Sequence, residues 1–189
     1  MTRIIAGAAK GRRLEIPSQG TRPTSDKVRG AIFSRLLGWG AVEDAHVLDL
    51  FAGSGALALE ALSRGAADAV AVEKSPAASA IVRKNAQSCG FQDVLTVATS
   101  DVTDYLKRAL PTREGLDLVF IDPPYSCSEQ EVSGVLEALL PHLHVDATIV
   151  LERDGRSPEP TIPPELTVLS GKRWGDTAAW YLGLAASEA

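Results

Sequence analysis

The sequence is poor in several kinds of feature, and each scarcity excludes a class of protein. Only two of the 189 residues are cysteine, and Cys89 and Cys127 are too far apart for a CxxC pair, which excludes a disulfide-stapled scaffold and predicts reduced thiols. No apolar run approaches the ~18 residues of a membrane-spanning helix, and the first residues lack the apolar segment of a secretory signal. The three histidines are not clustered with cysteine or acidic residues in metal-ligand spacing. We therefore expect a cytoplasmic protein that binds no metal and no membrane.

The overall composition is that of one globular domain, but its charge is uneven. Hydrophobic residues make up 45% and charged residues 23% of the chain, which is enough apolar material to bury a core. Residues 1–36 contain eight basic and two acidic side chains, whereas the rest contains 11 basic and 22 acidic ones. A basic segment joined to an acidic body suits a polyanionic ligand, although a solvated surface without a ligand explains the charge equally well.

The N-terminal residues are expected to form a hairpin. Two short extended runs, 3–6 and 12–16, flank a connection that contains glycine and basic side chains. A linker rich in proline, glycine, serine and threonine follows. We therefore divide the chain into a basic hairpin and linker over 1–23 and a main domain over 24–189.

The main domain should begin with an amphipathic helix. Thr24 or Ser25 can cap it, because a side-chain hydroxyl accepts hydrogen bonds from the free amides of the first turn. Apolar side chains recur at helical spacing and should be buried, namely Val28, Ile32 and Leu36. The basic side chains should stay in solvent, namely Lys27, Arg29 and Arg35.

From residue 46 onward, short apolar runs alternate with helical segments. The predicted strands are 46–51, 69–72, 94–98, 116–121 and 147–151, and the predicted helices are 56–64, 77–89, 102–110 and 129–140. This alternation is typical of an α/β fold in which helices cover both faces of a mostly parallel sheet. Residues 168–174 and 177–184 follow without a helix between them, so we expect a final antiparallel pair.

A glycine-rich turn follows the first strand of this series. The run Phe51-Ala52-Gly53-Ser54-Gly55 leads into a helix, and Glu73 stands at the end of the next strand, where a carboxylate can accept from ribose hydroxyls. The pattern predicts a ligand that contains adenosine, although a tight turn without a ligand is the alternative. Asp49 lies just before the turn and would repel a pyrophosphate, whereas it would attract the amino group of S-adenosylmethionine.

A second motif, Asp122-Pro123-Pro124-Tyr125, follows the fourth predicted strand. Consecutive prolines stiffen the loop and leave its carbonyl groups available. A carboxylate and a carbonyl side by side can accept both hydrogens of an exocyclic amino group, and a tyrosine ring can stack on a base that has left its helix. Alone, such a loop could also be a proline-stiffened connection with a packed tyrosine.

Together these motifs resemble the class I S-adenosylmethionine-dependent amino-methyltransferases. The N-terminal segments Arg3-Ile4-Ile5-Ala6-Gly7, Lys10-Gly11-Arg12-Arg13-Leu14 and Arg22-Pro23-Thr24-Ser25-Asp26-Lys27-Val28-Arg29 are similar to the opening of the RsmD family. The resemblance runs from residue 3 to about 184, more loosely over 172–177. It implies a Rossmann-like fold with a mostly parallel seven-stranded sheet, an antiparallel C-terminal strand pair and a small N-terminal hairpin. It also implies methylation of N2 of a guanine in 16S ribosomal RNA, guanine 966 in the usual numbering.

The resemblance also implies a role for each matching residue. The cofactor S-adenosylmethionine would be held by Asp49, Phe51, Gly53, Gly55, Glu73, Lys74, Asp101, Val102 and Asp122. The catalytic loop would consist of Asp122, Pro123, Pro124 and Tyr125. RNA phosphates would be held by Arg3, Lys10, Arg12, Arg13, Arg22, Lys27, Arg29 and Arg173. The partner would be 16S rRNA in the small ribosomal subunit or its assembly intermediate, and we expect a monomer.

Three other interpretations stay open at this point. An adenine-N6 methyltransferase uses the same Asp-Pro-Pro-Tyr loop, but a DNA enzyme of this kind usually needs a target-recognition domain for which 189 residues leave little room. A nicotinamide-dependent dehydrogenase is disfavoured by Asp49. A non-catalytic ribosome-assembly factor would keep the fold and the basic segment but lose cofactor binding.

Overall fold

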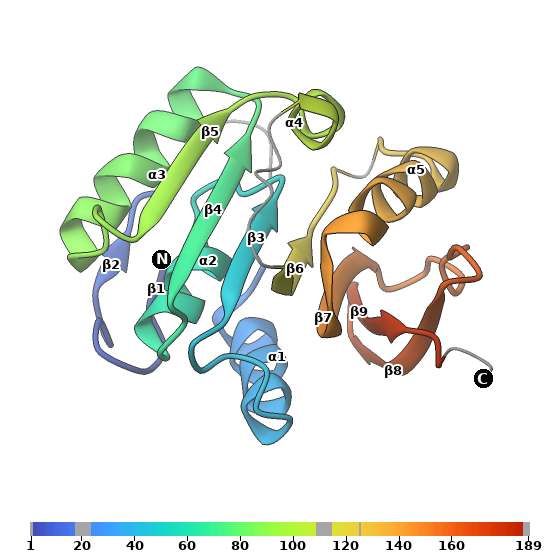
Figure 1. Ribbon diagram of the computed structural model, residues 1–189. Helices are drawn as coiled ribbons and strands as arrows, with labels where there is room; N and C mark the ends of the chain where they lie inside the picture. The colour runs from blue at the N-terminus through green and yellow to red at the C-terminus, as the bar shows by residue number, and fades with distance from the viewer. Residues whose placement is uncertain (1, 18–23, 109–114, 125, 187–189) are drawn as a thin grey trace.

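The computed structural model describes residues 2–17, 24–108, 115–124 and 126–186, which form fifteen regular elements (Figure 1). The strands are β1 (Thr2–Arg3), β2 (Arg13–Leu14), β3 (His46–Leu50), β4 (Asp68–Glu73), β5 (Leu95–Thr99), β6 (Leu116–Ile121), β7 (Leu143–Asp154), β8 (Leu166–Trp174) and β9 (Thr177–Leu184). The helices are α1 (Asp26–Gly38), α2 (Ala56–Ser63), α3 (Pro76–Cys89), α4 (Val102–Arg108), α5 (Glu129–Leu139) and the short 3-10 helix η1 (Leu140–His142). Each predicted strand and helix has a counterpart, with β7 extended at its start and the hairpin strands shorter than predicted. The last two residues of the predicted helix 102–110 lie outside the described residues.

Seven strands form one sheet in the order β5-β4-β3-β6-β7-β9-β8. The first five run parallel to one another, while β9 is antiparallel to both of its neighbours, β7 and β8. The predicted fold class is therefore confirmed, including the final antiparallel pair. The strand order reverses between β4 and β6 around the central strand β3, and in sheets of this kind ligands bind at such a switch point.

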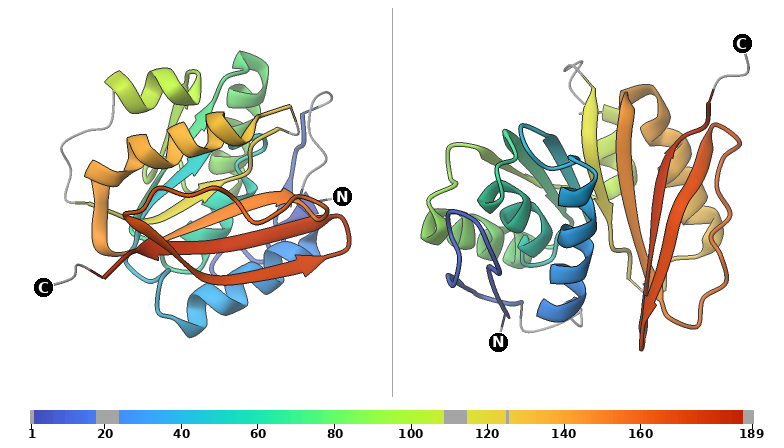
Figure 2. Two further views of the ribbon diagram at one scale, coloured as in Figure 1. Left: turned by 90° about the vertical axis from the view of Figure 1, so that its right-hand side faces the viewer. Right: turned by 90° about the horizontal axis from the view of Figure 1, so that it is seen from below.

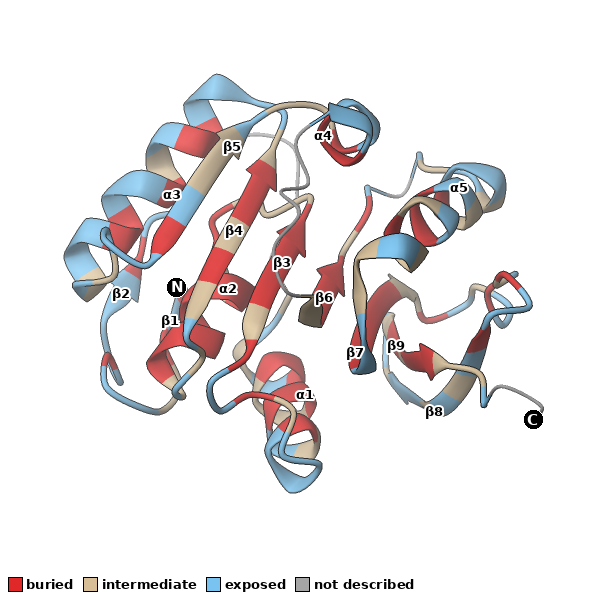
Figure 3. Cartoon of the chain, in the orientation of Figure 1, coloured by how far each residue is buried: buried red, intermediate tan, exposed pale blue. Residues whose placement is uncertain are grey.

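Helices cover both faces of the sheet (Figure 2). One apolar core contains side chains of α1, α2 and α3, and the other contains side chains of α4 and α5. Alternate residues of each strand serve the two cores: in β6, Leu118 and Phe120 face the first, while Val119 and Ile121 face the second. The central strands are almost entirely buried, as Figure 3 shows. Among the described helices, none is long and apolar enough to span a membrane.

The predicted N-terminal hairpin is present as the antiparallel pair β1 and β2, and it is docked firmly on α2 and α3. The amides of Ile5 and Ala6 donate to the carboxylate of Glu60 at 2.8 and 3.1 Å. Asn85 bridges to the backbone of Glu15 through two hydrogen bonds of 2.8 and 2.9 Å. The buried side chains of the hairpin belong to the same core as α1, so the hairpin is part of the packed body.

The expectation that Arg29 stays in solvent is wrong. Its side chain is fully buried on the face of α1 that meets the hairpin and α2. It donates to the carbonyl of Arg3, pairs with Asp26 at 3.1 Å and lies 3.6 Å from Glu60. Arg29 therefore joins three elements internally and is not available to RNA phosphates. Arg35 is also half-buried, because it donates to the hydroxyl of Ser170 at 2.7 Å and lies over the Tyr181 ring.

Candidate active site

The carboxyl ends of the five parallel strands lie along one edge of the sheet, toward which the arrowheads of β3 and β4 point at the top of Figure 1. A cavity of about 410 Å³ opens there beside β3, β6 and β7. Its walls include the predicted residues Asp49, Phe51, Gly53, Asp122, Pro123 and Pro124, together with Ile16, Pro17, Thr24, Arg29 and Glu152. The end of the hairpin segment thus reaches the cavity, which joins the N-terminal part of the chain to the candidate site.

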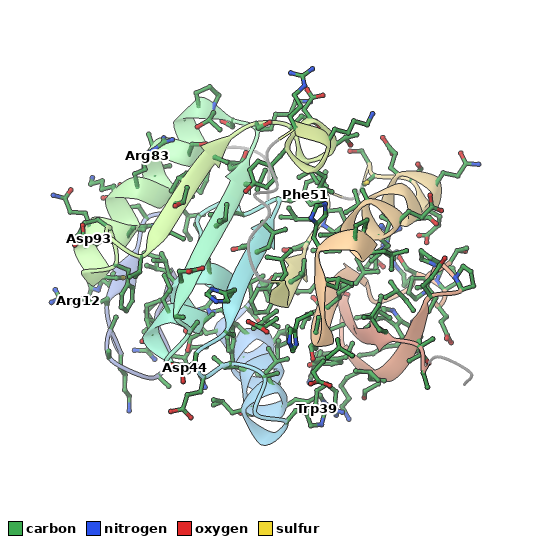
Figure 4. All side chains as sticks on the ribbon, in the orientation of Figure 1. Arg12, Trp39, Asp44, Phe51, Arg83 and Asp93 are labelled. Atoms are coloured by element: carbon green, nitrogen blue, oxygen red, sulfur yellow. The ribbon has the colours of Figure 1, made fainter. Side chains whose placement is uncertain are left out.

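The glycine turn after β3 has a backbone that few residues can adopt. Gly53 and Gly55 have φ angles of +57° and +75°, and Phe51 has a φ of +60° despite its bulky side chain. A Cβ atom on Gly55 would lie 2.8 Å from Val82 of α3, so both conformation and space require glycine there. Figure 4 shows Phe51 at the same edge of the sheet as the cavity. Such a strained turn, retained beside a cavity, is typical of a ligand-binding loop.

The predicted adenosine-binding residues lie at or just after the ends of β4 and β5, outside the cavity lining. Glu73 accepts hydrogen bonds from the amides of Gly53 and Ser75 at 2.9 and 2.8 Å, so its carboxylate is held against the glycine turn. Asp101 accepts from the amide of Thr103 at 2.9 Å and lies 3.3 Å from the Lys74 ammonium. These contacts position two carboxylates at adjacent strand ends, as the sequence predicted. Val102 begins α4, and its side chain is buried in the second core.

Three carboxyl groups meet at the other half of the edge, on the sheet face that α1 covers. Asp49 accepts from the amide of Ala58 at 3.0 Å. The hydroxyl of Thr24 lies 3.3 Å from Oδ2 of Asp122 and 3.1 Å from Oε2 of Glu152. The exposed fractions of Asp49 and Glu152 are 1% and 3%, whereas Asp122 keeps part of its surface open to the cavity.

Burial makes these three groups hold protons more tightly than usual. It raises the pKa of Asp49 to about 7, opposed by the Ala58 amide and reinforced by the charges of Asp122 and Glu73. Burial also raises the pKa of Asp122 to about 6, against the hydrogen bond with Thr24. For Glu152, burial raises the pKa well above its usual range, and the neighbouring Asp122 adds to the effect. The three groups are therefore harder to ionise together than isolated carboxyl groups.

The proline loop after β6 keeps an acceptor available beside Asp122. The Pro124 carbonyl accepts from the amide of Cys127 at 2.9 Å, but no described residue donates to the Pro123 carbonyl. Asp122 and the Pro123 carbonyl can thus accept from the two hydrogens of one amino group. Tyr125, predicted to stack on the base, lies outside the described residues.

The predicted RNA-binding side chains are spread over two regions. On the hairpin, the exposed basic residues are Arg3, Lys10, Arg12 and Arg13. Lys27, in the first turn of α1, is also exposed. Arg3 lies 3.8 Å from Asp26, and Arg173 donates to the carbonyls of Gly155 and Ser157 while remaining exposed. Arg22 lies outside the described residues. The exposed basic residues of the hairpin are therefore among those that a polyanion can reach.

Thr24 and Glu152 are polar residues of the cavity that sequence reasoning missed. The sequence suggests for Thr24 only the role of a helix cap, which Ser25 fills with a 3.2 Å bond from the Val28 amide. Glu152 directly follows Leu151, which pairs with Ile121, the residue before Asp122. A charged residue directly after the apolar run 149–151 was a signal that could have identified it, because carboxyl ends of neighbouring parallel strands meet.

The strand order, the antiparallel β9, the glycine turn and the two acidic strand ends define a class I methyltransferase, the class whose cofactor is S-adenosylmethionine. Comparisons with known proteins identify the family. A family model described as "Conserved hypothetical protein 95" matches residues 2–183. The chain is 34% identical to "Ribosomal RNA small subunit methyltransferase D" of Escherichia coli K12, covering 93% of this chain and 86% of that one. It is 35% identical to the protein of the same name from Haemophilus influenzae, with 92% and 89% covered. The chain therefore belongs to this family of ribosomal RNA methyltransferases, the RsmD family.

Solved structures agree with this assignment. The Escherichia coli protein yhhF superposes with a TM-score of 0.81 at 32% identity, covering 96% of this chain and 97% of that chain. A protein from Thermus thermophilus superposes with a TM-score of 0.84 at 28% identity, covering 97% of this chain and the whole of that chain. The N-terminal hairpin and the catalytic domain are thus both within the matched region.

Proposed function

We propose that this protein methylates the exocyclic N2 of a guanine in 16S ribosomal RNA, by direct transfer to a base that has left its helix. The observation that carries the proposal is that Asp122 and Pro123, whose carbonyl accepts from no described residue, both lie on the wall of the cavity. Two neighbouring acceptors suit an amino group, which has two hydrogens to donate. The named relatives support rRNA as substrate, and the resemblance of the N-terminal segments supports guanine 966 in the usual numbering.

The residues at the sheet edge fit S-adenosylmethionine. Glu73 stands where a carboxylate can accept from ribose hydroxyls, and Asp101 stands at the next strand end, where the adenine amino group would lie. The glycine turn allows a ligand to approach its backbone closely, and the buried Asp49 is suited to the amino group of the methionine part. When bound, the cofactor supplies an electrophilic sulfonium methyl group. Lys74 and Val102 complete the predicted ribose and adenine contacts.

The chain's own residues orient and activate the guanine. N2 is a poor nucleophile because its lone pair is delocalised into the ring. Asp122 and the Pro123 carbonyl would each accept one N2 hydrogen, which favours localising that lone pair away from the ring. Positioning of this kind supplies a large part of catalysis when the reacting atoms are held about 3–3.5 Å apart. Asp122 is also the nearest group able to take the surplus proton, directly or through water, and Tyr125 would stack on the base.

The proposal is tested by methyl transfer to small ribosomal subunits that lack native modification. Labelled S-adenosylmethionine is added, and the rRNA is digested and its nucleosides separated. We expect the label in N2-methylguanosine. Label in N6-methyladenosine would instead favour the adenine-specific alternative, and no label, with a control enzyme active on the same particles, would favour a non-catalytic assembly factor or another substrate. Bare 16S rRNA assayed in parallel tells whether the assembled subunit is needed.

The exposed basic hairpin is the proposed RNA contact outside the base pocket. Replacing Lys10, Arg12 and Arg13 together with alanine should weaken binding to ribosomal particles by roughly tenfold or more and reduce the salt dependence, because each phosphate contact contributes about 0.7–0.9 to the slope of log affinity against log salt. Substitution is preferable to deletion, since Ile4 and Leu14 of the hairpin are buried in the core.

A matched control removes Lys107 and Arg108, two exposed basic residues of α4. Particle binding is measured over a range of salt concentrations, and cofactor binding is measured alongside. An unchanged salt slope for the hairpin variant would exclude the hairpin from RNA recognition.

We also propose that the protein acts in the cytoplasm, where an rRNA substrate would be found, and that its active unit is a monomer.

A further inference from the structure

Glu152 is a buried carboxyl group with one oxygen unaccounted for. Its side chain is 3% exposed and lines the cavity beside Asp122. Oε2 lies 3.1 Å from the hydroxyl of Thr24, but Oε1 has no hydrogen-bond partner among the described residues. A buried polar atom without a partner costs about 1–3 kcal/mol, so its retention on a cavity wall points to a ligand that supplies the missing hydrogen bond.

The contacts of Thr24 specify which kind of partner Oε1 needs. A hydroxyl has one hydrogen to donate, yet Thr24 lies between two carboxyl oxygens, Oδ2 of Asp122 at 3.3 Å and Oε2 of Glu152 at 3.1 Å. Two arrangements satisfy all three groups, with the shared proton on Glu152 or on Asp122. Because Glu152 is 3% exposed while Asp122 is partly open to the cavity, we place the proton on Oε2 of Glu152, which donates to Thr24, which in turn donates to Asp122. The raised pKa of Glu152 agrees with this assignment. Oε1 is then a carbonyl-type oxygen that can only accept.

We propose that Oε1 of Glu152 accepts the N1 hydrogen of the target guanine and makes the site selective for guanine. The inference rests on the proposed function, because it places N2 of the same base on Asp122 and the Pro123 carbonyl. The base presents two adjacent hydrogen-bonding groups, and the protein presents two adjacent carboxyl groups to receive them. N1 and N2 are adjacent on the Watson–Crick edge, while Asp122 and Glu152 follow the paired residues Ile121 and Leu151 of adjacent strands.

The chemistry separates guanine from other bases that carry an amino group. Guanine has a hydrogen on N1, whereas adenine and 2,6-diaminopurine have a lone pair at that position. A lone pair facing Oε1 would leave two acceptors opposed in a buried site. The loss of such a hydrogen bond, with a buried group left unpaired, corresponds to a selectivity on the order of tenfold to one-hundredfold.

The test compares two substrates that share the reacting amino group. Small subunits are reconstituted with 16S rRNA carrying either guanine or 2,6-diaminopurine at the methylated position, and kcat/KM is measured for each. Glu152→Met removes the acceptor, whereas Glu152→Gln keeps a carbonyl oxygen and a donor to Thr24. Glu137→Met, at an exposed position of α5, is the matched control. Glu152→Met should fold, because it replaces an unpaired buried oxygen with an apolar group, and thermal unfolding checks this.

We expect Glu152→Met to lower kcat/KM on guanine by at least about tenfold while transfer to 2,6-diaminopurine stays the same or rises. For Glu152→Gln and Glu137→Met, the ratio of kcat/KM on guanine to kcat/KM on 2,6-diaminopurine should stay within about threefold of the wild-type ratio. An equal loss on both substrates in Glu152→Met would mean a structural role and overturn the inference while leaving the proposed function intact. Wild-type enzyme that methylates neither substrate would overturn the proposed function itself, and the inference with it.

Discussion

The two halves of the sheet edge hold carboxyl groups in opposite electrostatic environments. At the ends of β4 and β5, Glu73 and Asp101 accept from backbone amides, and Asp101 also pairs with Lys74, so the pKa of Asp101 is lowered despite partial burial. At the ends of β3, β6 and β7, the groups Asp49, Asp122 and Glu152 are crowded and buried, and their pKa values are raised.

This difference fits two different tasks. Asp101, whose pKa is lowered by amides and by Lys74, stays ionised and can bind a neutral base without changing its own state. Buried carboxyl groups that share protons are costly to the fold, but they present acceptors whose strength depends on protonation. We infer that the β4–β5 half holds the adenosine part of the cofactor and Asp49 its methionine part, while Asp122 and Glu152 act on the base.

The largest effect is expected from removing the charge of Asp122. Asp122→Asn keeps the shape but replaces one acceptor oxygen with an amino donor that opposes the N2 hydrogens. Turnover should fall by about 10²–10⁴-fold, the range typical of losing a positioned acid–base group. Binding of S-adenosylhomocysteine, measured by calorimetry, should stay within a fewfold of wild type.

The control for that variant is Asp93→Asn, at an exposed position of the opposite, amino-end side of the sheet (Figure 4). Near-normal turnover in Asp122→Asn would exclude the role given to Asp122.

In the wild type, kcat/KM should rise with pH through about 6, as Asp122 ionises and becomes the stronger acceptor.

Much of this edge could be predicted from the sequence, for a physical reason. Motifs that lie directly after a strand, such as Gly53 and Asp122, are local, and the parallel topology brings strand ends together. The hairpin and the final strand pair were also predictable, because their turns are short. Arg29 was mispredicted because helical periodicity identifies an apolar face but does not show that the hairpin and Glu60 enclose the adjacent face. Glu152 was missed because its meaning depends on Thr24, a residue 128 positions away.

A second, smaller effect concerns stability and pH. Because the folded-state pKa of Asp49 is about 7, above the ordinary value of 3.8, the folded protein binds more protons than the unfolded chain between these values. The contribution of Asp49 to stability is therefore present at low pH and is lost as pH rises through about 7, by up to roughly 4 kcal/mol.

Asp49→Asn should remove this loss, because an asparagine oxygen still accepts from the Ala58 amide without carrying a charge. Denaturant unfolding is measured between pH 5 and pH 8. The free energy of unfolding of the variant should increase relative to that of the wild type as pH rises. The exposed residue Asp44 offers the control, Asp44→Asn, which should follow the wild type. A stability difference that is constant across this range would mean that Asp49 is ionised throughout.

The smallest effect is expected in the β4–β5 half. Both oxygens of Glu73 accept from backbone amides, one from Gly53 and one from Ser75, whereas Glu73→Gln leaves one acceptor oxygen. The variant therefore loses one of these two bonds and the acceptor pair for ribose. Affinity for S-adenosylhomocysteine should fall by about tenfold, the equivalent of one charge-assisted hydrogen bond. Turnover at saturating cofactor should keep the wild-type pH profile, because Asp122, which sets it, owes its raised pKa to burial and not to Glu73. Glu43→Gln, at an exposed position, is the control. A changed pH profile with unchanged affinity would reverse the division of tasks between the two halves.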